Sequence, residues 1–520
     1  MRARLGVAAA VVLGAIWACG GGSGSGDVGA GNDAGTTADS GTATDAGSCP
    51  FGAPCPSPPP DAGTDAGTGQ TADAGTDGGV SIVVPNAQGW TFLTASDGLS
   101  STEVMGAGVD EGGNLWVAGG TGGVFVMRKG AKTLQQFGLA DGLHPYGYMP
   151  DGGPADLNPH LEAISVSGGP SGTAFIGYMG KTPPGGNPYE CEGNWDGPNP
   201  DPAIYKSGDA DKVTLQGAGI SVVHYDIFSG PDVVKDELRG REKLCHIRRI
   251  LYDHTANPDG THSVWFGGNH GFAWGKAEFA GDPTCNGEYQ GDPDFHPGNC
   301  AGVFEHVHPA VDGPSGGTLT QDYFGMAFDS QPTPDGTHDV WFGGYNRTTL
   351  FKYGTLHEDY FNAQTATEND PSNIIDVWKD TIPNTQVTLQ PNDDNVSSIV
   401  ALPNGHVLIG SFDHGIRELD HAGNFVRDVP GLPVPHVFAM ARDPEDGSIW
   451  VGYGGAGVSQ ILADGTVKNY AGAVFGDALT NMEVHDIQID TVNTATADPN
   501  VKHNRVIISF KGGVVGIHQN

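Results

Sequence analysis

From about residue 80 onward, the chain alternates short apolar runs with turns rich in glycine and aspartate. The run PDGTHSVWFGG (258–268) recurs as PDGTHDVWFGG (334–344), and looser copies occupy 112–120, 172–180, 405–411, 447–454 and 504–510. Each copy follows an apolar strand and precedes a glycine-led strand. Short strands at regular spacing, repeated along a chain, predict an all-β repeat fold. We therefore expect seven four-stranded antiparallel blades, a seven-bladed β-propeller over residues 80–520.

Two residue types recur at fixed places in these units. An aspartate often ends the first strand, and a tryptophan often lies in the middle of the second. We interpret the tryptophans as core residues that pack between adjacent blades. The aspartates are Asp110, Asp253, Asp329, Asp443 and Asp490, and the tryptophans are Trp116, Trp265, Trp341 and Trp450.

The two ends of the repeat region predict how the ring closes. The segment GWTFLTASDGL (89–99) resembles TLQQFGLADGL (133–143), which is the fourth strand of a unit. The final run, GVVGIHQN, corresponds to a third strand. We therefore expect the N-terminal strand to complete the last blade, which hides the exposed strand edges.

The first 19 residues, MRARLGVAAAVVLGAIWAC, read as an export signal. Two arginines precede an apolar run that is short for a membrane span, and small residues follow. The segment 16–19 resembles the bacterial lipobox, which implies that Cys19 is lipidated and that 1–19 is a lipoprotein signal peptide. The alternative is a plain signal peptide that is cleaved nearby. We expect an exported protein that is lipid-anchored to the outer membrane or the cell surface.

Residues 20–79 consist almost entirely of Gly, Ala, Ser, Thr, Asp and Pro, without Lys or Arg. Such a segment has little to bury, so we expect a disordered stalk. The chain has a formal net charge of -36. This charge argues against nucleic acid as a partner and against membrane contact other than through the lipid anchor. We expect a monomer.

The cysteines other than Cys19 are even in number, which in an oxidising compartment favours disulfides. Their connectivity stays open. The pairings that we expect are Cys49 with Cys55, Cys191 with Cys245, and Cys285 with Cys300.

The segments 110–124 and 443–458 resemble the two-component regulator propeller repeat, D-x-x-G-x-L-W-I-G-T-x-x-G-L. The resemblance implies the propeller fold and does not specify an activity. A more distant resemblance is to the streptogramin-cleaving lyases, which are seven-bladed propellers with histidine near the channel mouth. No motif of those lyases is matched residue by residue.

The residue seven places before each strand-ending aspartate begins an innermost strand, at the mouth of the central channel, and in two further units a gap or a substitution in the alignment gives the corresponding residues, His160 and Asn395. These positions hold side chains that bind metals or move protons. They are Glu103, His160, His246, Asp322, Asn395, His436 and Glu483. Loops that we expect on the same face add further candidate ligand contacts: Trp195, His270, Tyr345, Arg347 and His414.

These residues leave three functions open. The first is a module that binds a small molecule, a glycan or a partner protein at the channel face. The second is a lyase acting on a polysaccharide or a cyclic ester, in which a histidine removes a proton and an arginine neutralises a carboxylate. Its bases would be His246, His436 and His270, and its arginine Arg347.

The third function is zinc or copper binding, in which His160, His246 and His436 act with Glu103 or Glu483. A divalent metal is thus a cofactor in this alternative. A basic stretch, 235–249, adjoins His246 and suggests an anionic ligand, although its bases also have acidic neighbours in the sequence to pair with.

Overall fold

The computed structural model describes residues 84, 87–145, 160–180, 208–225, 227, 246–269, 271–281, 302–307, 323–334, 336–344, 347–351, 374–376, 395–493 and 503–519. All of them belong to one compact unit, Thr64–Asn520. The predicted signal peptide and the whole predicted stalk, with Cys19, Cys49 and Cys55, lie outside the described residues.

The described residues form seven antiparallel sheets, each of four strands. Blade 1 comprises β2 (Gly106–Val109), β3 (Leu115–Ala118), β4 (Val124–Met127) and β5 (Gln135–Phe137). Blade 2 comprises β6 (Ala163–Gly168), β7 (Thr173–Tyr178), β8 (Ala210–Gln216) and β9 (Gly219–Tyr225). Blade 3 comprises β10 (Ile247–Ala256), β11 (His262–Gly268), β12 (Gly271–Lys276) and β13 (Val303–Val307). Blade 4 comprises β14 (Gly325–Pro332), β15 (His338–Gly344), β16 (Arg347–Phe351) and β17 (Ile374–Asp376).

The last three blades follow the same order. Blade 5 comprises β18 (Val396–Ala401), β19 (Val407–Ser411), β20 (Gly415–Leu419) and β21 (Phe425–Asp428). Blade 6 comprises β22 (Val437–Arg442), β23 (Ile449–Tyr453), β24 (Val458–Ile461) and β25 (Val467–Tyr470). Blade 7 comprises β26 (Val484–Asp490), β27 (Arg505–Phe510), β28 (Val514–Gln519) and β1 (Trp90–Leu93).

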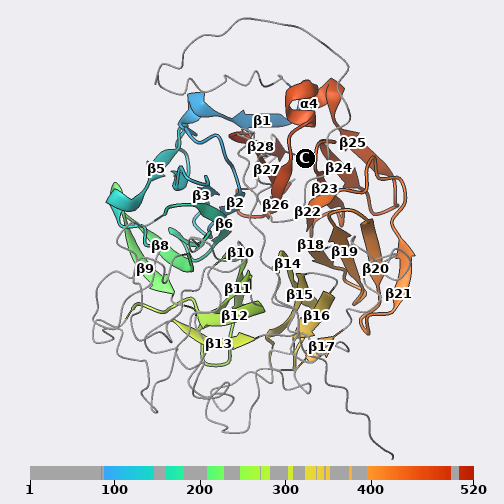
Figure 1. The fold of residues 1–520 in the computed structure, drawn as a ribbon, viewed down its shortest axis with the longest axis horizontal. Coiled ribbons are helices and arrows are strands. Elements are labelled where there is room, and N and C mark those ends of the chain that lie inside the picture. Colours follow the sequence, from blue (N-terminus) through green and yellow to red (C-terminus); the bar gives the residue numbers. More distant parts are fainter. Residues whose placement is uncertain are drawn as a thin grey trace, which may run out of the picture. The chain divides into compact units, whose positions relative to one another are not determined.

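The blades are arranged in a closed ring. The first strand of each blade contacts the first strand of the next, and β26 of blade 7 contacts β2 of blade 1. Figure 1 shows these first strands around a common centre, with the later strands of each blade further out. The predicted all-β propeller is therefore confirmed.

The N-terminal strand closes the last blade, as predicted. Strand β1 pairs antiparallel with β28, so that Trp90 lies opposite His518 and Leu93 opposite Val515. The ring of Trp90 also packs edge-on against Trp450 of blade 6 and Phe475. Because the two ends of the propeller sequence share one sheet, closing the ring requires a long-range contact.

The repeated tryptophans lie between adjacent blades. Trp116, Trp265, Trp341 and Trp450 are at most 1% exposed. Trp265 of blade 3 packs with Val340 and Phe342 of blade 4, and the tryptophans of blades 4 and 6 likewise join clusters that reach the next blade. Their predicted role in core packing is confirmed.

The strand-ending aspartates link neighbouring blades. Asp110 accepts a hydrogen bond from the indole of Trp116 (2.8 Å) and one from the backbone N–H of Gly172 in blade 2 (3.2 Å). A buried carboxylate needs such donors, because it loses its hydration. Equivalent contacts to the next blade join the pairs Asp253 and His338, Asp329 and His421, and Asp443 and Asn504.

Short helices follow the last strands of three blades among the described residues. The 3-10 turns η1 (Ala95–Asp97) and η2 (Leu139–Asp141) follow β1 and β5, and helix α4 (Gly472–Thr480) follows β25. Phe475 and Leu479 are the buried residues of α4, on either side of a kink at Gly476, and they pack against blade 7. Among the described residues, no helix is long and apolar enough to cross a bilayer.

Candidate functional site

We call the seven residues predicted at the channel mouth the ring residues. Those that the structure describes lie where the innermost strands begin. His246, Asn395, His436 and Glu483 immediately precede β10, β18, β22 and β26. Glu103 and His160 lie three residues before β2 and β6. We call this side of the propeller the channel-mouth face.

Several predicted contacts lie outside the described residues. Arg347 begins β16, but the position of its side chain is not described. The other residues are Trp195, His270, Asp322, Tyr345, Cys191, Cys245, Cys285 and Cys300. Their predicted roles and pairings stay predictions.

His246 is the most buried of the described ring histidines, at 1% exposure. Its Nδ1 accepts a hydrogen bond from the backbone N–H of Gly180 (2.9 Å). Burial, followed by the charge of Arg248, holds the pKa of His246 well below 6.5, so the ring is neutral at pH 7. A neutral imidazole that accepts at Nδ1 carries its proton at Nε2. In the described part of the chain, no hydrogen-bond partner meets this buried Nε2.

His436 has the opposite orientation. Its Nδ1 lies 3.0 Å from the carbonyl oxygen of Phe412 and 3.2 Å from a carboxylate oxygen of Asp413. Both neighbours accept hydrogen bonds, so Nδ1 is the protonated nitrogen in the neutral ring and Nε2 carries the lone pair. The side chain is 46% exposed, so this lone pair is accessible at the channel-mouth face. His414 follows Asp413 and donates its backbone N–H to the hydroxyl of Ser411 (2.8 Å).

Glu483 lies between His485 and Lys511. His485 Nε2 is 2.9 Å from one carboxylate oxygen, and Lys511 Nζ is 3.9 Å from the other. Burial raises the pKa of Glu483, but the hydrogen bond from His485 and the charges of His485 and Lys511 outweigh it, so the pKa lies below its usual value. Glu483 is therefore an ionised acceptor at neutral pH.

The predicted metal histidines each have a different local neighbour. His160 Nε2 lies 2.8 Å from a carboxylate oxygen of Glu162, whereas His246 and His436 make the contacts given above. Among the described residues, the channel mouth brings no three metal-ligating side chains together. The zinc or copper hypothesis for these three histidines stays a prediction.

An ion pair crosses the channel below its mouth. Arg249, the third residue of β10, bonds to Asp486, the third residue of β26. Blades 3 and 7 are separated by blades 1 and 2 on one side and by blades 4 to 6 on the other, so the pair spans the ring. One arginine of the basic stretch is thus already paired.

A cavity of about 140 Å³ lies toward the other end of the channel. Most of the residues that line it come from the later parts of the innermost strands, and they include Val109, Gly168, Tyr252 and Asp490. The ion pair therefore occupies a level between this cavity and the channel mouth.

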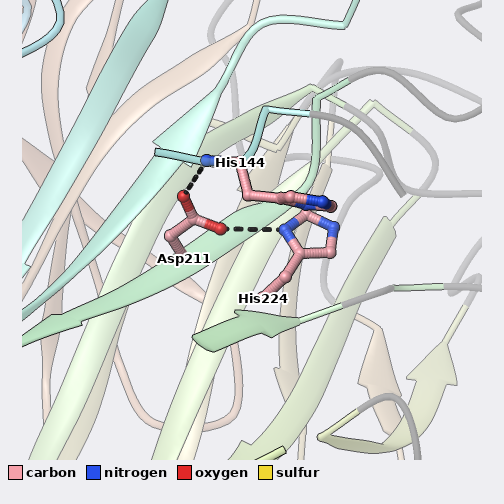
Figure 2. A group of neighbouring side chains, drawn as sticks. All are labelled: His144, Asp211 and His224. Atoms are coloured by element: carbon pink, nitrogen blue, oxygen red, sulfur yellow. Dashed lines mark hydrogen bonds and ion pairs between the residues drawn. The ribbon is translucent and has the colours of Figure 1, made fainter. Parts of the chain in front are cut away.

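A second polar cluster on the channel-mouth face was not predicted from the sequence. It consists of His144, between η2 and β6, with Asp211 of β8 and His224 of β9 (Figure 2). None of the three occupies a position that recurs among the repeats. The available signal was the hairpin itself, because counting back from the turn at Gly217 places Asp211 opposite His224.

No protein-family model matches this chain, and no curated protein matches it. Among solved structures, the chain is similar to the extracellular domain of a hybrid two-component system of B. thetaiotaomicron, with a TM-score of 0.47 at 12% identity over 82% of this chain and 41% of that one. Virginiamycin B lyase from Staphylococcus aureus matches with a TM-score of 0.44 at 10% identity, over 83% of this chain and 99% of that one. Sqt1 of Saccharomyces cerevisiae matches with a TM-score of 0.45 at 12% identity, over 84% and 99%.

The chain spans about two fifths of the length of the extracellular domains of a one-component system and of a hybrid two-component system, both of B. thetaiotaomicron, that it matches. The similar structures include the extracellular domain of a two-component system and a streptogramin B lyase, and the sequence bears a resemblance to both kinds of protein. At these identities the likeness concerns the fold alone. The propeller assignment rests on the seven sheets and on their closure into a ring.

Proposed function

We propose that this chain is an exported, lipid-anchored protein that binds a ligand, most specifically a neutral glycan, at the channel-mouth face. The observation that carries the proposal is the buried Nε2–H of His246, which has no partner among the described residues. An unpaired buried donor costs about 1–3 kcal/mol, so it is retained where something else accepts from it.

The ring residues offer both hydrogen-bond donors and acceptors, which supports a neutral ligand rich in hydroxyl groups. Glu483 is an ionised acceptor, and His246 presents a donor. A sugar hydroxyl both donates and accepts, so one glycan satisfies both kinds of group. A polyanion would instead be repelled by the carboxylates among the ring residues and by the net charge of -36 on the chain.

The channel below the mouth also supports binding. The pair of Arg249 and Asp486 crosses the ring, so a ligand that enters at the mouth meets a polar floor. The proposed site therefore lies on the mouth side of the ion pair, and its ligand contacts come from several blades.

The test is a microarray of neutral, uronic-acid and sulfated glycans probed with the full chain, followed by calorimetry on the hits. Glu483→Gln and His436→Ala should weaken binding to a neutral glycan at least tenfold. The matched control is Glu111→Gln, because Glu111 is an exposed carboxylate at the opposite end of blade 1. Equal affinity in both channel-mouth variants and the control, or a preference for uronic acids, would contradict the proposal.

A lyase is the second candidate, and the orientation of His436 favours it. Its accessible Nε2 lone pair is what a general base requires, whereas the Nε2 of His246 is already protonated. A lyase that acts on uronic-acid polymers releases unsaturated products that absorb in the ultraviolet. Loss of that absorbance in His436→Ala, with the fold intact by circular dichroism, would support this candidate. No absorbance with the unmodified chain would remove it.

A further inference from the structure

The outer hairpin of blade 2 places an aspartate and a histidine side by side. Strands β8 and β9 pair antiparallel, and Asp211 lies directly opposite His224. Both lie near the end of the hairpin that reaches the channel-mouth face. His144 joins them from the connection between blades 1 and 2, where its backbone N–H donates to Asp211 (2.7 Å).

The three side chains converge. One donor atom from each lies within 4.8 Å of the other two. Figure 2 shows the two imidazoles and the carboxylate grouped together. The ring centroids of His144 and His224 are 4.7 Å apart. Asp211 is fully buried, the side chain of His224 is 2% exposed, and His144 is half-buried. Two imidazoles and a carboxylate in a buried cluster form a donor set typical of zinc and related ions.

Hydrogen bonds hold the carboxylate of Asp211 in place. It accepts from the hydroxyl of Tyr178 (2.6 Å) and lies 2.9 Å from Nδ1 of His224. These contacts fix the carboxylate of Asp211 beside Nδ1 of His224, so an ion bound between the two would take the place of the proton that they share.

A second buried carboxylate adds negative charge to the cluster. Asp209 is 0% exposed, and its Oδ2 lies 3.6 Å from Nε2 of His224. Asp209 is also the one non-glycine residue of the described chain with a positive φ, at 59°. Backbone strain of this kind persists where the surrounding structure requires it, frequently at functional sites. Two buried carboxylates within one cluster favour a bound cation.

We infer that blade 2 binds a divalent transition-metal ion of the zinc class through His144, Asp211 and His224, beside Asp209. Zinc bound tetrahedrally at 2.0–2.1 Å needs donor atoms roughly 3.4 Å apart, so the cluster must contract slightly around the ion. His144 is the ligand placed to move, because it is half-buried and lies on a connection. Magnesium and calcium do not fit, because they require mainly oxygen ligands.

The ion would fasten the connection between blades 1 and 2 onto the outer hairpin of blade 2. Its ligands are separate from the channel-mouth residues, so this inference does not depend on the proposed glycan site. Failure of either one leaves the other standing.

The test is zinc binding by the full chain after removal of metals with a chelator. The chelator-treated protein is titrated with zinc by calorimetry in the presence of a competing ligand, and magnesium serves as the comparison ion. We expect one tight zinc site in the unmodified chain, no response to magnesium, and a rise in melting temperature with zinc alone.

Two variants and a control locate the site. His144→Ala and Asp211→Asn should each weaken zinc binding at least a hundredfold and abolish the rise in melting temperature. His254→Ala is the control, since His254 is also a histidine paired with a carboxylate but lies outside the cluster, with its side chain 62% exposed. If Asp211→Asn fails to fold, His144→Ala decides alone. Zinc binding that is absent from the unmodified chain, or unchanged in His144→Ala, would overturn the inference.

Discussion

Removing Arg249 from the channel ion pair should destabilise the propeller by a measurable amount. In Arg249→Met the carboxylate of Asp486, only 4% exposed, loses its cationic partner and keeps the amide of Gln488. Breaking a buried pair from one side costs roughly 3–5 kcal/mol. The side chain of Arg249 is 21% exposed, so water reaches this pair and we expect a cost of about 2–3 kcal/mol.

The assay is differential scanning calorimetry at pH 7. Unfolding entropy of about 2.1 cal/mol/K per residue, over about 430 residues, gives about 0.9 kcal/mol/K, so each kcal/mol lowers the melting temperature by about 1 °C. Arg249→Met should therefore melt about 2–3 °C lower than the unmodified chain. The double variant Arg249→Met, Asp486→Leu should recover most of this loss, because no buried charge remains.

Two results would refute this reasoning. An unchanged melting temperature in Arg249→Met would mean that the pair contributes no net stability. A double variant no more stable than Arg249→Met would mean that the loss comes from packing of the arginine side chain.

Three further predictions concern the propeller itself. Trp90→Ala removes the aromatic side chain that anchors the closing strand β1 and should lower the free energy of unfolding by about 3–5 kcal/mol. The melting temperature should fall and hydrogen exchange in β28 should become faster. Unchanged exchange would contradict the closing role. Burial, followed by the charge of Lys468, lowers the pKa of His518 from 6.5 to about 4. The stability that the neutral imidazole supplies is full above pH 6.5, and about 3 kcal/mol of it is lost as the pH falls toward 4. By calorimetry, His518→Phe should therefore lose less stability between pH 7 and 4.5 than the unmodified chain. Equal losses would refute this. In Gly168→Ala the new β-carbon would lie 2.0 Å from the carbonyl oxygen of Val109 in blade 1, so the free energy of unfolding should fall by about 1–3 kcal/mol in chemical denaturation. The control Gly219→Ala makes only ordinary contacts and should not lose this stability. Similar losses in both variants would contradict the close approach.

Repetition made the fold predictable. The strand pattern repeats along the chain, so strands that are ambiguous in one unit can be assigned from the corresponding strands of the others. The likeness of 89–99 to 133–143 identified the closing strand. Helix α4 was not predicted, because it lies between units and its two buried residues, Phe475 and Leu479, are too few to show a helical period.

The site was predictable only in part. Aligning the repeats placed His246, His436 and Glu483 at the starts of innermost strands, but which ring nitrogen is protonated depends on backbone groups such as Gly180 N–H and the carbonyl of Phe412. Those groups belong to other parts of the chain, so no local pattern records them. For the same reason, the sequence could not show that the strand-ending aspartates bond to the next blade, because those partners are in another repeat.

The cluster in blade 2 illustrates the same limit. Hairpin register places Asp211 opposite His224 from the sequence alone, once the turn at Gly217 is recognised. The approach of His144 depends on the path of the connection between blades 1 and 2, which local periodicity does not describe.

A crystal structure of the full chain with a glycan identified on the array would test the central claim most directly. The account predicts a glycan at the channel mouth, with a hydroxyl oxygen within about 3.2 Å of Nε2 of His246 and another hydroxyl donating to Glu483. A glycan bound anywhere else on the propeller, with Nε2 of His246 bonded to a protein group instead, would contradict it.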